Sequence, residues 1–302
     1  MSYAWRNLQE HSSPFALKLI RWIALHLGRP VARLLLYPIS GYYFLFAKHQ
    51  RRASRLYLRR VLNKEPSWLD VVRHIFCFAS TILDRIYLIT GQFDKLQIAF
   101  PTENMPLKFS SNGSGCLLLG SHLGSFEVLR SYAVKKCPLP IKILMHEGQT
   151  PMVMHMFNAL NPKVAETIIP LTGGMNSLLE VKEALANGYA VGMLGDRIAG
   201  DATEKTVLCK LLGGVVAMPT APIVIAAALK VPLIVFFGLY LGGNRYEIHF
   251  ELLAERIDLS RHNRQQELQQ WTQRYVDLLE KYMLAAPYNW FNFYDYWQDD
   301  ER

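Results

Sequence analysis

Long apolar runs are missing from this 302-residue sequence: a helix that crosses a membrane needs about 20 apolar residues, and no segment offers them. The two best candidates are 15–27 and 31–47. Both are broken by charged residues, and the second also by Pro38 and Gly41. Neither alone predicts a clean span, whereas a hairpin that dips into one leaflet and a single tilted span both stay open. The first 15 residues are polar without a cleavage-site pattern, so we expect no signal peptide.

Cysteine is scarce, and glycine forms none of the nucleotide-binding patterns. The four cysteines, Cys77, Cys116, Cys137 and Cys209, are not paired at metal spacing, so we expect reduced thiols in a cytosolic compartment. No cluster of His, Cys and carboxylates has ligand spacing, and we expect no metal site. Neither G-x-G-x-x-G nor a P-loop is present, which leaves nucleotide binding unsupported. The absence of G-x-S-x-G disfavours a covalent acyl-enzyme on serine.

Charged residues are also few, at 19% against an average of about 25% for globular proteins. Apolar residues reach 51%, the mean hydropathy is +0.07, and the net charge is +8 with a pI near 9.3. A basic, apolar-rich chain favours nucleic acid or an anionic membrane surface as partner. Nucleic acid is the poorer choice, because the basic and aromatic residues form no known module and the apolar N-terminal region would stay unexplained.

A basic segment adjoins the apolar N-terminal runs. Residues 48–60 contain six basic side chains and no acid, and Lys48, Arg52, Arg55 and Arg59 recur at helical spacing on one face. A basic amphipathic helix beside an apolar segment is typical of contact with anionic lipid. An ordinary solvated helix face is the alternative. If the chain spans the membrane, the positive-inside rule places this segment in the cytoplasm.

The sequence divides into a helical N-terminal region, 1–92, which we expect to associate with a membrane, and an α/β domain, 93–302. A capping box at Ser67–Asp70 opens a helix that runs to about Ile89. Beyond it, strand and helix patterns alternate, which predicts a mixed, mostly parallel central sheet flanked by helices. The expected strands are 115–120, 140–146, 166–170, 189–195, 206–211, 232–240 and 245–252, the last two as a hairpin. The expected helices are 124–136, 151–160, 174–187, 219–229 and 263–285.

One histidine stands out by its position. The segment "GSHLGSFE" (120–127) follows an apolar run, 116–119, and precedes a helical pattern. A histidine with an acid five residues later is weak evidence alone: about 0.7 such pairs are expected by chance. The chain holds two, His122/Glu127 and His262/Glu267. The second lies in a polar helix start, and we interpret it as the chance match.

His122 differs because it follows a strand, and open α/β sheets bind ligands beyond the carboxyl ends of their strands. Gly120 and Gly124 allow a tight turn. Glu127, in the first turns of the next helix, could then hold one imidazole nitrogen and leave the other as a general base. Without its own nucleophile, such a base suggests that the substrate supplies the hydroxyl or amine in direct acyl transfer. The alternative is a structural histidine with Glu127 on the helix surface.

Four blocks of the chain resemble, in order, those of the lipid A biosynthesis acyltransferases, part of the lysophospholipid acyltransferase superfamily with its His-x4-Asp/Glu signature. "GSHLGSFE" resembles the H-x-G-N-W-E block, and "MLGDRIAG" (193–200) resembles the later aspartate-containing block. "MPTAPIVIAAALKVPLIVFFG" (218–238) is similar to the proline-containing block and its strand. "NWFNFYDYW" (289–297) is similar to the ending of a branch found beside glycosyltransferases and aryl-polyene or fatty-acid-like synthesis genes. The resemblance covers roughly residues 10–297.

The resemblance implies an O-acyltransferase at the cytoplasmic face of the inner membrane. The fatty acyl donor would be an acyl thioester, with acyl carrier protein expected over coenzyme A, and the acceptor a lipid or glycolipid hydroxyl. His122 matches the general base and Glu127 its partner, while Asp196 and Arg197 match the second block, with a role in positioning substrate or supporting the site. No cofactor is implied.

Two positions depart from the family pattern. Ser125 and Phe126 stand where lipid A enzymes commonly have Asn and Trp, which leaves the identity of the acceptor open. Arg130, one helical turn after Glu127, and Arg197 are candidates for holding a phosphate of the pantetheine arm or of the acceptor. Surface salt bridges are the alternative for both.

The aromatic ending, 290–297, fits a strap packed on the core better than an interfacial belt. Two other functions stay open: a thioesterase or hydrolase that uses the His–Glu pair on water, and a non-catalytic membrane-docked scaffold in which His122 is structural.

Overall fold

A computed structural model describes residues 14–101, 106, 109, 115–129, 139–146, 160–171, 175–198 and 205–298 of the chain. The helix expected at 124–136 is described only as far as Leu129, and the helix expected at 151–160 falls almost wholly outside these residues.

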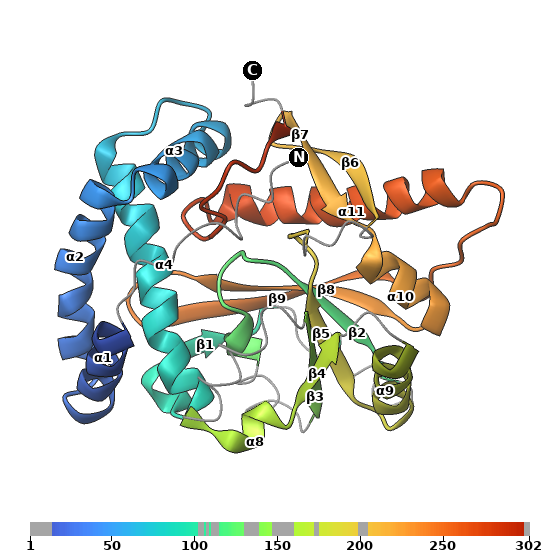
Figure 1. The fold of residues 1–302 in the computed structure, drawn as a ribbon, viewed down its shortest axis with the longest axis horizontal. Coiled ribbons are helices and arrows are strands. Elements are labelled where there is room, and N and C mark those ends of the chain that lie inside the picture. Colours follow the sequence, from blue (N-terminus) through green and yellow to red (C-terminus); the bar gives the residue numbers. More distant parts are fainter. Residues whose placement is uncertain are drawn as a thin grey trace.

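The N-terminal region is helical, as expected. It consists of α1 (Pro14–His26), α2 (Arg29–Phe46), α3 (Lys48–Leu62) and α4 (Trp68–Ile89), which lie together at the left of Figure 1. The capping box at the start of α4 is confirmed: Ser67 Oγ accepts from the Asp70 N–H, and the Asp70 carboxylate accepts from the Ser67 N–H. None of the helices in the described residues is long and apolar enough to cross a membrane.

A seven-stranded sheet forms the centre of the molecule. Its strands are β1 (Gln97–Ala99), β2 (Leu117–Gly120), β3 (Ile141–His146), β4 (Ile168–Leu171), β5 (Ala190–Leu194), β8 (Leu233–Tyr240) and β9 (Arg245–Ala254). They lie in the order β1-β9-β8-β2-β5-β3-β4, and every neighbouring pair is parallel except the β8–β9 hairpin. The prediction of a mixed, mostly parallel sheet is therefore confirmed.

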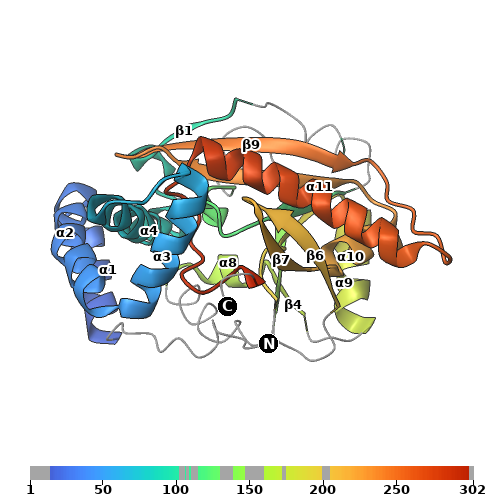
Figure 2. The same ribbon diagram turned by 90° about the horizontal axis from the view of Figure 1, so that it is seen from above.

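Helices cover both faces of this sheet. Figures 1 and 2 show α11 (Arg264–Ala285) across one face and the short α8 (Pro162–Ala165) toward the other, with α9 (Met175–Ala186) and α10 (Ala221–Leu229) near one edge. Two short 3₁₀ turns, η1 (Phe93–Lys95) and η2 (Phe126–Val128), complete the layout.

The sequence patterns missed two strands. β1 has only three residues and pairs with β9 at the sheet edge, too short for an alternating pattern. β7 (Gly214–Pro219) pairs with β6 (Thr206–Leu211) in a separate antiparallel hairpin, so α10 begins later than the expected residue 219. The outer edge of β6 is satisfied by α11, because the Gln273 side chain bonds both the N–H and the C=O of Lys210.

One core crosses the expected boundary between the two regions. Tyr57 and Leu58 of α3 and Val71 of α4 pack in the same apolar cluster as strand residues such as Leu117 and Val235. The helical region is thus packed against the sheet through buried side chains rather than tethered beside it.

A buried ion pair adds a polar link between the helices and the hairpin. The Asp84 carboxylate on α4 accepts hydrogen bonds from Arg29 at 2.6 and 2.8 Å and from the Tyr246 hydroxyl at 2.9 Å. Arg29 and Arg33 also donate to the carbonyl oxygen of Gly243 in the β8–β9 turn. A buried charge with this many partners is costly to leave half-paired, so it fixes α2 and α4 on the hairpin.

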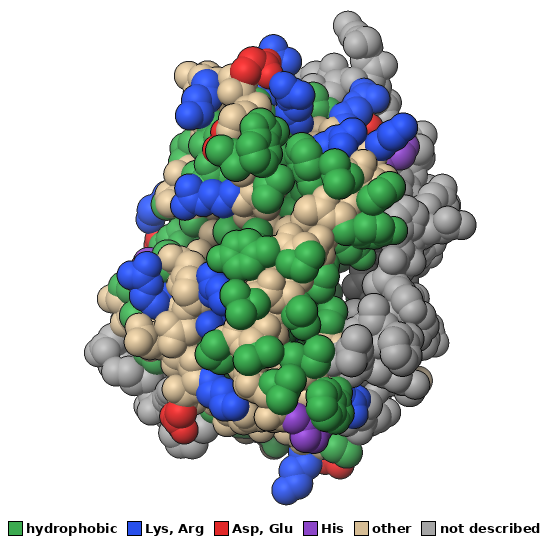
Figure 3. Space-filling model, turned by 90° about the vertical axis from the view of Figure 1, so that its left-hand side faces the viewer, with side chains coloured by type: hydrophobic (Ala, Val, Ile, Leu, Met, Phe, Trp, Pro, Cys, Tyr) green, Lys and Arg blue, Asp and Glu red, His purple; other side chains and the backbone are tan. Residues whose placement is uncertain are grey.

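The outward side of the N-terminal helices is apolar. Val31, Leu34, Tyr37, Tyr42 and Leu45 follow helical spacing along α2 and are exposed. Figure 3 looks onto this side and shows hydrophobic side chains gathered across it with Lys and Arg among and around them. We refer to the exposed apolar residues of α1, α2 and the turn between them as the apolar face: Trp22, Leu27, Val31, Leu34, Tyr37, Tyr42, Leu45 and Phe46.

Candidate active site

The sheet brings His122 and Asp196 together by register. β2 and β5 are parallel neighbours, and Gly120 at the end of β2 lies opposite Leu194 at the end of β5. His122 lies two residues after Gly120, and Asp196 lies two residues after Leu194. Two side chains separated by 74 residues in the sequence therefore meet at the carboxyl edge of the sheet.

Asp196 holds the imidazole of His122 by one ring nitrogen. Nδ1 of His122 lies 2.8 Å from Oδ1 of Asp196, and the backbone N–H of His122 donates to Oδ2 at 2.9 Å. An ionised carboxylate at Nδ1 requires the proton there, which leaves Nε2 with a lone pair. The carboxylate is fully buried, whereas 23% of the His122 side chain is exposed, and no described residue bonds Nε2. Nε2 is thus the nitrogen available to a substrate.

The charges around this pair favour a neutral histidine beside an ionised aspartate. Burial lowers the pKa of His122 and the positive charges of Arg197 and Arg85 lower it further, while Asp196 offsets part of this. Burial alone would raise the pKa of Asp196, but the contacts with His122 and the charge of Arg197 outweigh it and lower that pKa to about 2. A neutral imidazole oriented by a carboxylate is the resting form of a general base.

The predicted pairing of Glu127 with His122 is not the arrangement in the structure. Glu127 lies on η2, facing α4 rather than the imidazole, and its Oε1 is 2.8 Å from Nε of Arg85. Its second carboxylate oxygen is buried and has no hydrogen-bond partner among the residues that the structure describes. Sequence spacing placed the acid near the histidine, but the chain turns before η2 and directs the carboxylate to Arg85. A role for Glu127 in the reaction stays a prediction.

The turn that carries His122 needs glycine for a reason of space. Gly124 has a φ of +78°, and a Cβ at this position would lie 2.0 Å from the carbonyl oxygen of Gly238 on β8. That oxygen accepts from the N–H of Ser125 at 2.8 Å, and the N–H of Gly124 donates to the carbonyl oxygen of Asn289. The turn is thus pressed between β8 and the C-terminal segment.

The C-terminal aromatic segment, 289–297, is packed against the core as expected, and we call it the strap. Trp290, Phe291 and Trp297 are buried. The N–H of Phe291 donates to the carbonyl oxygen of His122 at 2.8 Å, and the Tyr296 hydroxyl donates to the carbonyl oxygen of Asp196 at 2.6 Å. The strap therefore bonds the backbone of both members of the pair.

The N-terminal helices hold the strap in place. His74 of α4 is completely buried, with Nε2 2.8 Å from the Trp290 carbonyl oxygen and Nδ1 2.8 Å from the Ser54 hydroxyl of α3. Burial lowers the pKa of His74 to about 4, so its ring is neutral and donates to the strap while accepting from Ser54. This histidine is a structural link, in contrast to His122.

Arg197 makes two hydrogen bonds to the strap, and a contact of this side chain with a phosphate stays a prediction. Its Nε donates to Oδ1 of Asn292 at 2.6 Å, and its Nη2 donates to the Phe291 carbonyl oxygen at 3.0 Å. Arg130, the other candidate for phosphate, lies outside the described residues. No three His, Cys, Asp or Glu side chains come together as metal ligands within the described residues.

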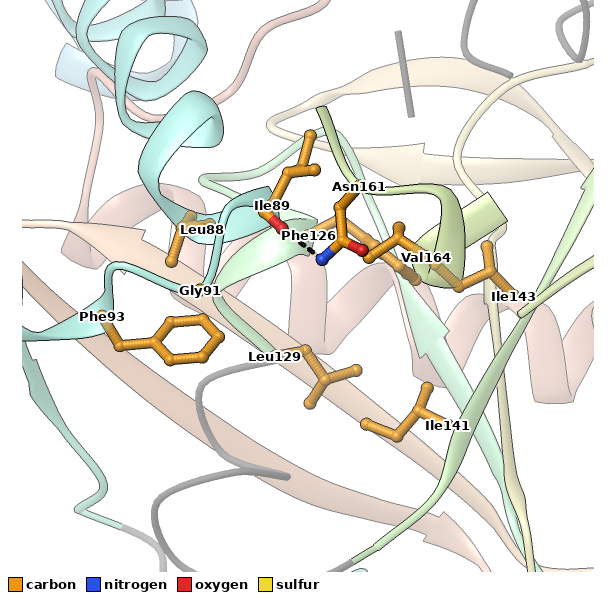
Figure 4. Close-up of a pocket in the computed structure, with 10 residues that line it drawn as sticks. All are labelled: Leu88, Ile89, Gly91, Phe93, Phe126, Leu129, Ile141, Ile143, Asn161 and Val164. Atoms are coloured by element: carbon orange, nitrogen blue, oxygen red, sulfur yellow. Dashed lines mark hydrogen bonds between the residues drawn. The ribbon is translucent and has the colours of Figure 1, made fainter. Parts of the chain in front are cut away.

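A mostly apolar cavity lies beside the turn that follows His122. Its volume is about 280 Å³, and Figure 4 shows its wall built by the end of α4, the η2 turn, β3 and α8. The turn after His122 supplies Phe126 and Leu129, and β3 supplies Ile141 and Ile143. The polar side chain in the lining is Asn161, whose Nδ2 donates to the Ile89 carbonyl oxygen. The lining fits a hydrocarbon chain better than a polar ligand.

Sequence reasoning found His122, Asp196 and Arg197 but missed Asn292, Arg85 and His74. The partnership of His122 with Asp196 had a usable signal, because both residues follow buried strands, and the carboxyl ends of parallel strands lie on the same side of a sheet. Arg85 and His74 sit within the amphipathic pattern of α4 with no local signal.

Comparison with known proteins places the whole chain in a family. The sequence model of one protein family, described as bacterial lipid A biosynthesis acyltransferase, matches residues 6–299 of this chain. Among solved structures, the chain is similar to the 1-acyl-sn-glycerophosphate (LPA) acyltransferase PlsC from Thermotoga maritima, at 15% sequence identity over 83% of this chain and 97% of that chain. The TM-score of 0.35 is too low to support an argument from the shared fold. None of the curated proteins matches the sequence.

The geometry predicts how acyl transfer depends on pH. Because the pKa of His122 is lowered, its neutral form persists into mildly acidic solution, and we expect the acid limb of kcat/KM below the ordinary histidine value of 6.5. D196N removes the negative charge that raises the pKa of His122, so the acid limb should move to still lower pH. The kcat of D196N should fall about 10²- to 10⁴-fold, because the imidazolium loses its partner.

The matched variant is E127Q, which removes the negative charge beside Arg85 and leaves the His122–Asp196 hydrogen bond intact. Its kcat should fall less than that of D196N, as measured by pH-rate profiles of acyl transfer. A larger loss in E127Q than in D196N would contradict the assignment of Asp196 as the partner.

Proposed function

This chain belongs to the family of bacterial lipid A biosynthesis acyltransferases, and on that premise we propose that it moves a fatty acyl group from an acyl thioester to a hydroxyl of a lipid or glycolipid acceptor, with His122 as the general base. The observation that carries the proposal is the hydrogen bond between Nδ1 of His122 and Asp196 at the carboxyl edge of the sheet. It leaves Nε2 to accept a proton, which is the chemistry that direct acyl transfer requires.

In the proposed reaction, Nε2 of His122 takes the proton of the acceptor hydroxyl while the hydroxyl oxygen attacks the carbonyl carbon of the thioester. A C–O bond forms and the carbonyl becomes an oxyanion. When the C–S bond breaks, the imidazolium returns the proton to the leaving thiolate. Asp196 stabilises the imidazolium between these two steps, because a buried ion pair is strong where water is excluded.

The cavity supports a fatty acyl group as the transferred group. Its walls are apolar, and Phe126 and Leu129 belong to the turn that follows the base. Phe126 is one of the two departures from the family pattern, so its ring shapes a cavity that a tryptophan would fill differently. Acyl carrier protein as donor, a phosphate contact at Arg130 and the aryl-polyene branch stay predictions from the resemblance.

The apolar face supports the proposal that the protein docks on an anionic membrane, which contains the lipid acceptor. Between Glu10 and Glu65 the chain has no acidic residue, while Lys and Arg recur throughout this stretch. On α3, Lys48, Arg52, Arg55 and Arg59 are exposed, as the helical spacing predicted. Exposed apolar side chains flanked by such cations suit the boundary between acyl chains and anionic headgroups. We propose docking at the cytoplasmic face of the inner membrane.

The proposed activity is tested by following label from acyl thioesters into lipid. Membranes that contain the wild-type protein are mixed with a total lipid extract and a thioester whose acyl group is labelled. The thioester is either acylated acyl carrier protein or acyl-coenzyme A. We expect label in a lipid, and H122A should reduce it about 10²- to 10⁴-fold because the base is lost. The control, H262A, alters the exposed histidine of the chance motif and should retain transfer.

Two other outcomes of this experiment would overturn the proposal. Label released only as free fatty acid would make the protein a thioesterase. Equal transfer by wild type and H122A would exclude His122 as the base.

If the cavity holds the acyl group, its size limits the length of the acyl chain that the protein accepts. I143W fills the cavity, so kcat/KM for the longest accepted thioester should fall about tenfold or more relative to a shorter one, since one methylene in an apolar pocket is worth 10- to 200-fold. The control is I248A, a buried isoleucine of β9 outside the cavity, which should lower stability without changing the chain-length profile. An unchanged profile in I143W would exclude the cavity as the acyl site.

The apolar face predicts binding to vesicles. L34E/L45E should weaken binding to vesicles with anionic lipid about tenfold or more, because two apolar side chains lose their burial and negative charge is added. The control is L208E, which changes an exposed leucine on β6. Equal binding by L34E/L45E and L208E in a sedimentation assay would show that another surface docks.

A further inference from the structure

The strap carries two buried asparagines that make different contacts. Asn289 accepts from the N–H of Tyr240 at 2.7 Å and donates to its carbonyl oxygen at 3.0 Å, so it fixes the end of β8. Asn292 instead bonds two side chains: its Nδ2 donates to Oδ2 of Asp196 at 3.0 Å, and its Oδ1 accepts from Nε of Arg197 at 2.6 Å. The Asn292 side chain is thus inserted between the carboxylate and the guanidinium.

We propose that Asn292 is a positioning residue that keeps the carboxylate of Asp196 on His122 by holding Arg197 away from it. The proposal rests on the function of His122 as the general base. Neighbouring carboxylate and guanidinium groups form strong two-point ion pairs when they meet directly. Such a pair would occupy the oxygens of Asp196 that now bond the ring and backbone of His122.

The amide side chain of Asn292 satisfies both neighbours at once. The carboxylate needs a donor and the guanidinium needs an acceptor, and the two ends of the Asn292 amide supply one each. A carboxylate in its place would offer no donor to Asp196, and an aliphatic side chain would offer neither. Asn292 is 1% exposed, so water does not replace the lost bonds.

Several further charged and titratable groups face the pair of His122 and Asp196. Three tyrosines come from α11 and the strap, and burial raises the pKa of each above the ordinary value. Arg197 and Arg85 also face the pair, and the carboxylate of Glu127 lies beside Arg85. The charged and titratable groups around His122 are thus Arg85, Glu127, Asp196, Arg197, Tyr275, Tyr294 and Tyr296.

The test combines activity with direct titration of His122. N292L removes both bonds and keeps the branch point at Cγ, and N289L is the matched control for damage to the strap. The third variant is R197Q and the fourth is N292L/R197Q. The pKa of the His122 imidazole is followed by NMR of histidine-labelled protein, with H122A to assign the signal, and acyl transfer is measured on the same samples.

We expect N292L to let Arg197 pair with Asp196. The pKa of His122 should then fall by about one unit, because a positive charge moves closer and the carboxylate is drawn away. The kcat should drop about tenfold or more, with the KM for the thioester little changed. N289L should lose a similar amount of thermal stability without moving this pKa.

The double variant separates positioning from packing. R197Q removes the competing cation, so N292L/R197Q should regain much of the kcat lost in N292L and return the pKa upward. Equal kcat in N292L and N289L, with an unmoved His122 pKa in N292L, would overturn the positioning role and leave the base intact. Full transfer by H122A would overturn the proposed function, and the role of Asn292 with it.

Discussion

The buried carboxylate of Asp196 is the constraint on which the site depends. An ionised carboxylate in the interior is costly unless donors satisfy its oxygens. Here three donors do so: Nδ1 and the backbone N–H of His122, and Nδ2 of Asn292. They come from the turn after β2 and from the strap, near the end of the chain. Satisfying one charge therefore ties together three segments that are far apart in the sequence, and the same hydrogen bonds orient the imidazole of His122.

The supports of this charge extend into the N-terminal helices. His74 links α3 and α4 to the strap, and Asp84 links α2 and α4 to the β8–β9 hairpin through Arg29 and Tyr246. Helix α4 thus contacts both the strap that positions Asp196 and the helix that carries most of the apolar face. We infer that the surface proposed to meet the membrane and the residues proposed to act on the acyl group share one rigid support.

Local patterns predicted most elements because each pattern arises from burial along one segment. The four N-terminal helices, the central strands and the hairpin turn all follow apolar periodicity and breakers such as Gly28 and Gly242-Gly243. The misses have a different origin. β1 is too short to show alternation, and the β6–β7 hairpin is completed by side chains of α11 rather than by a third strand. Contacts with distant segments define both.

The site shows the same division. The sequence by itself determined the position of His122 after a buried strand, the glycine-containing turn that presents it, and the apolar and basic character of the first helices. Only the tertiary structure decided the partner of the imidazole. Glu127 is closer in sequence, but η2 directs it to Arg85, whereas the parallel register of β2 and β5 places Asp196 beside Nδ1. Spacing along a chain fixes which residues can be neighbours within one element, while strand order and register fix which residues meet across the sheet.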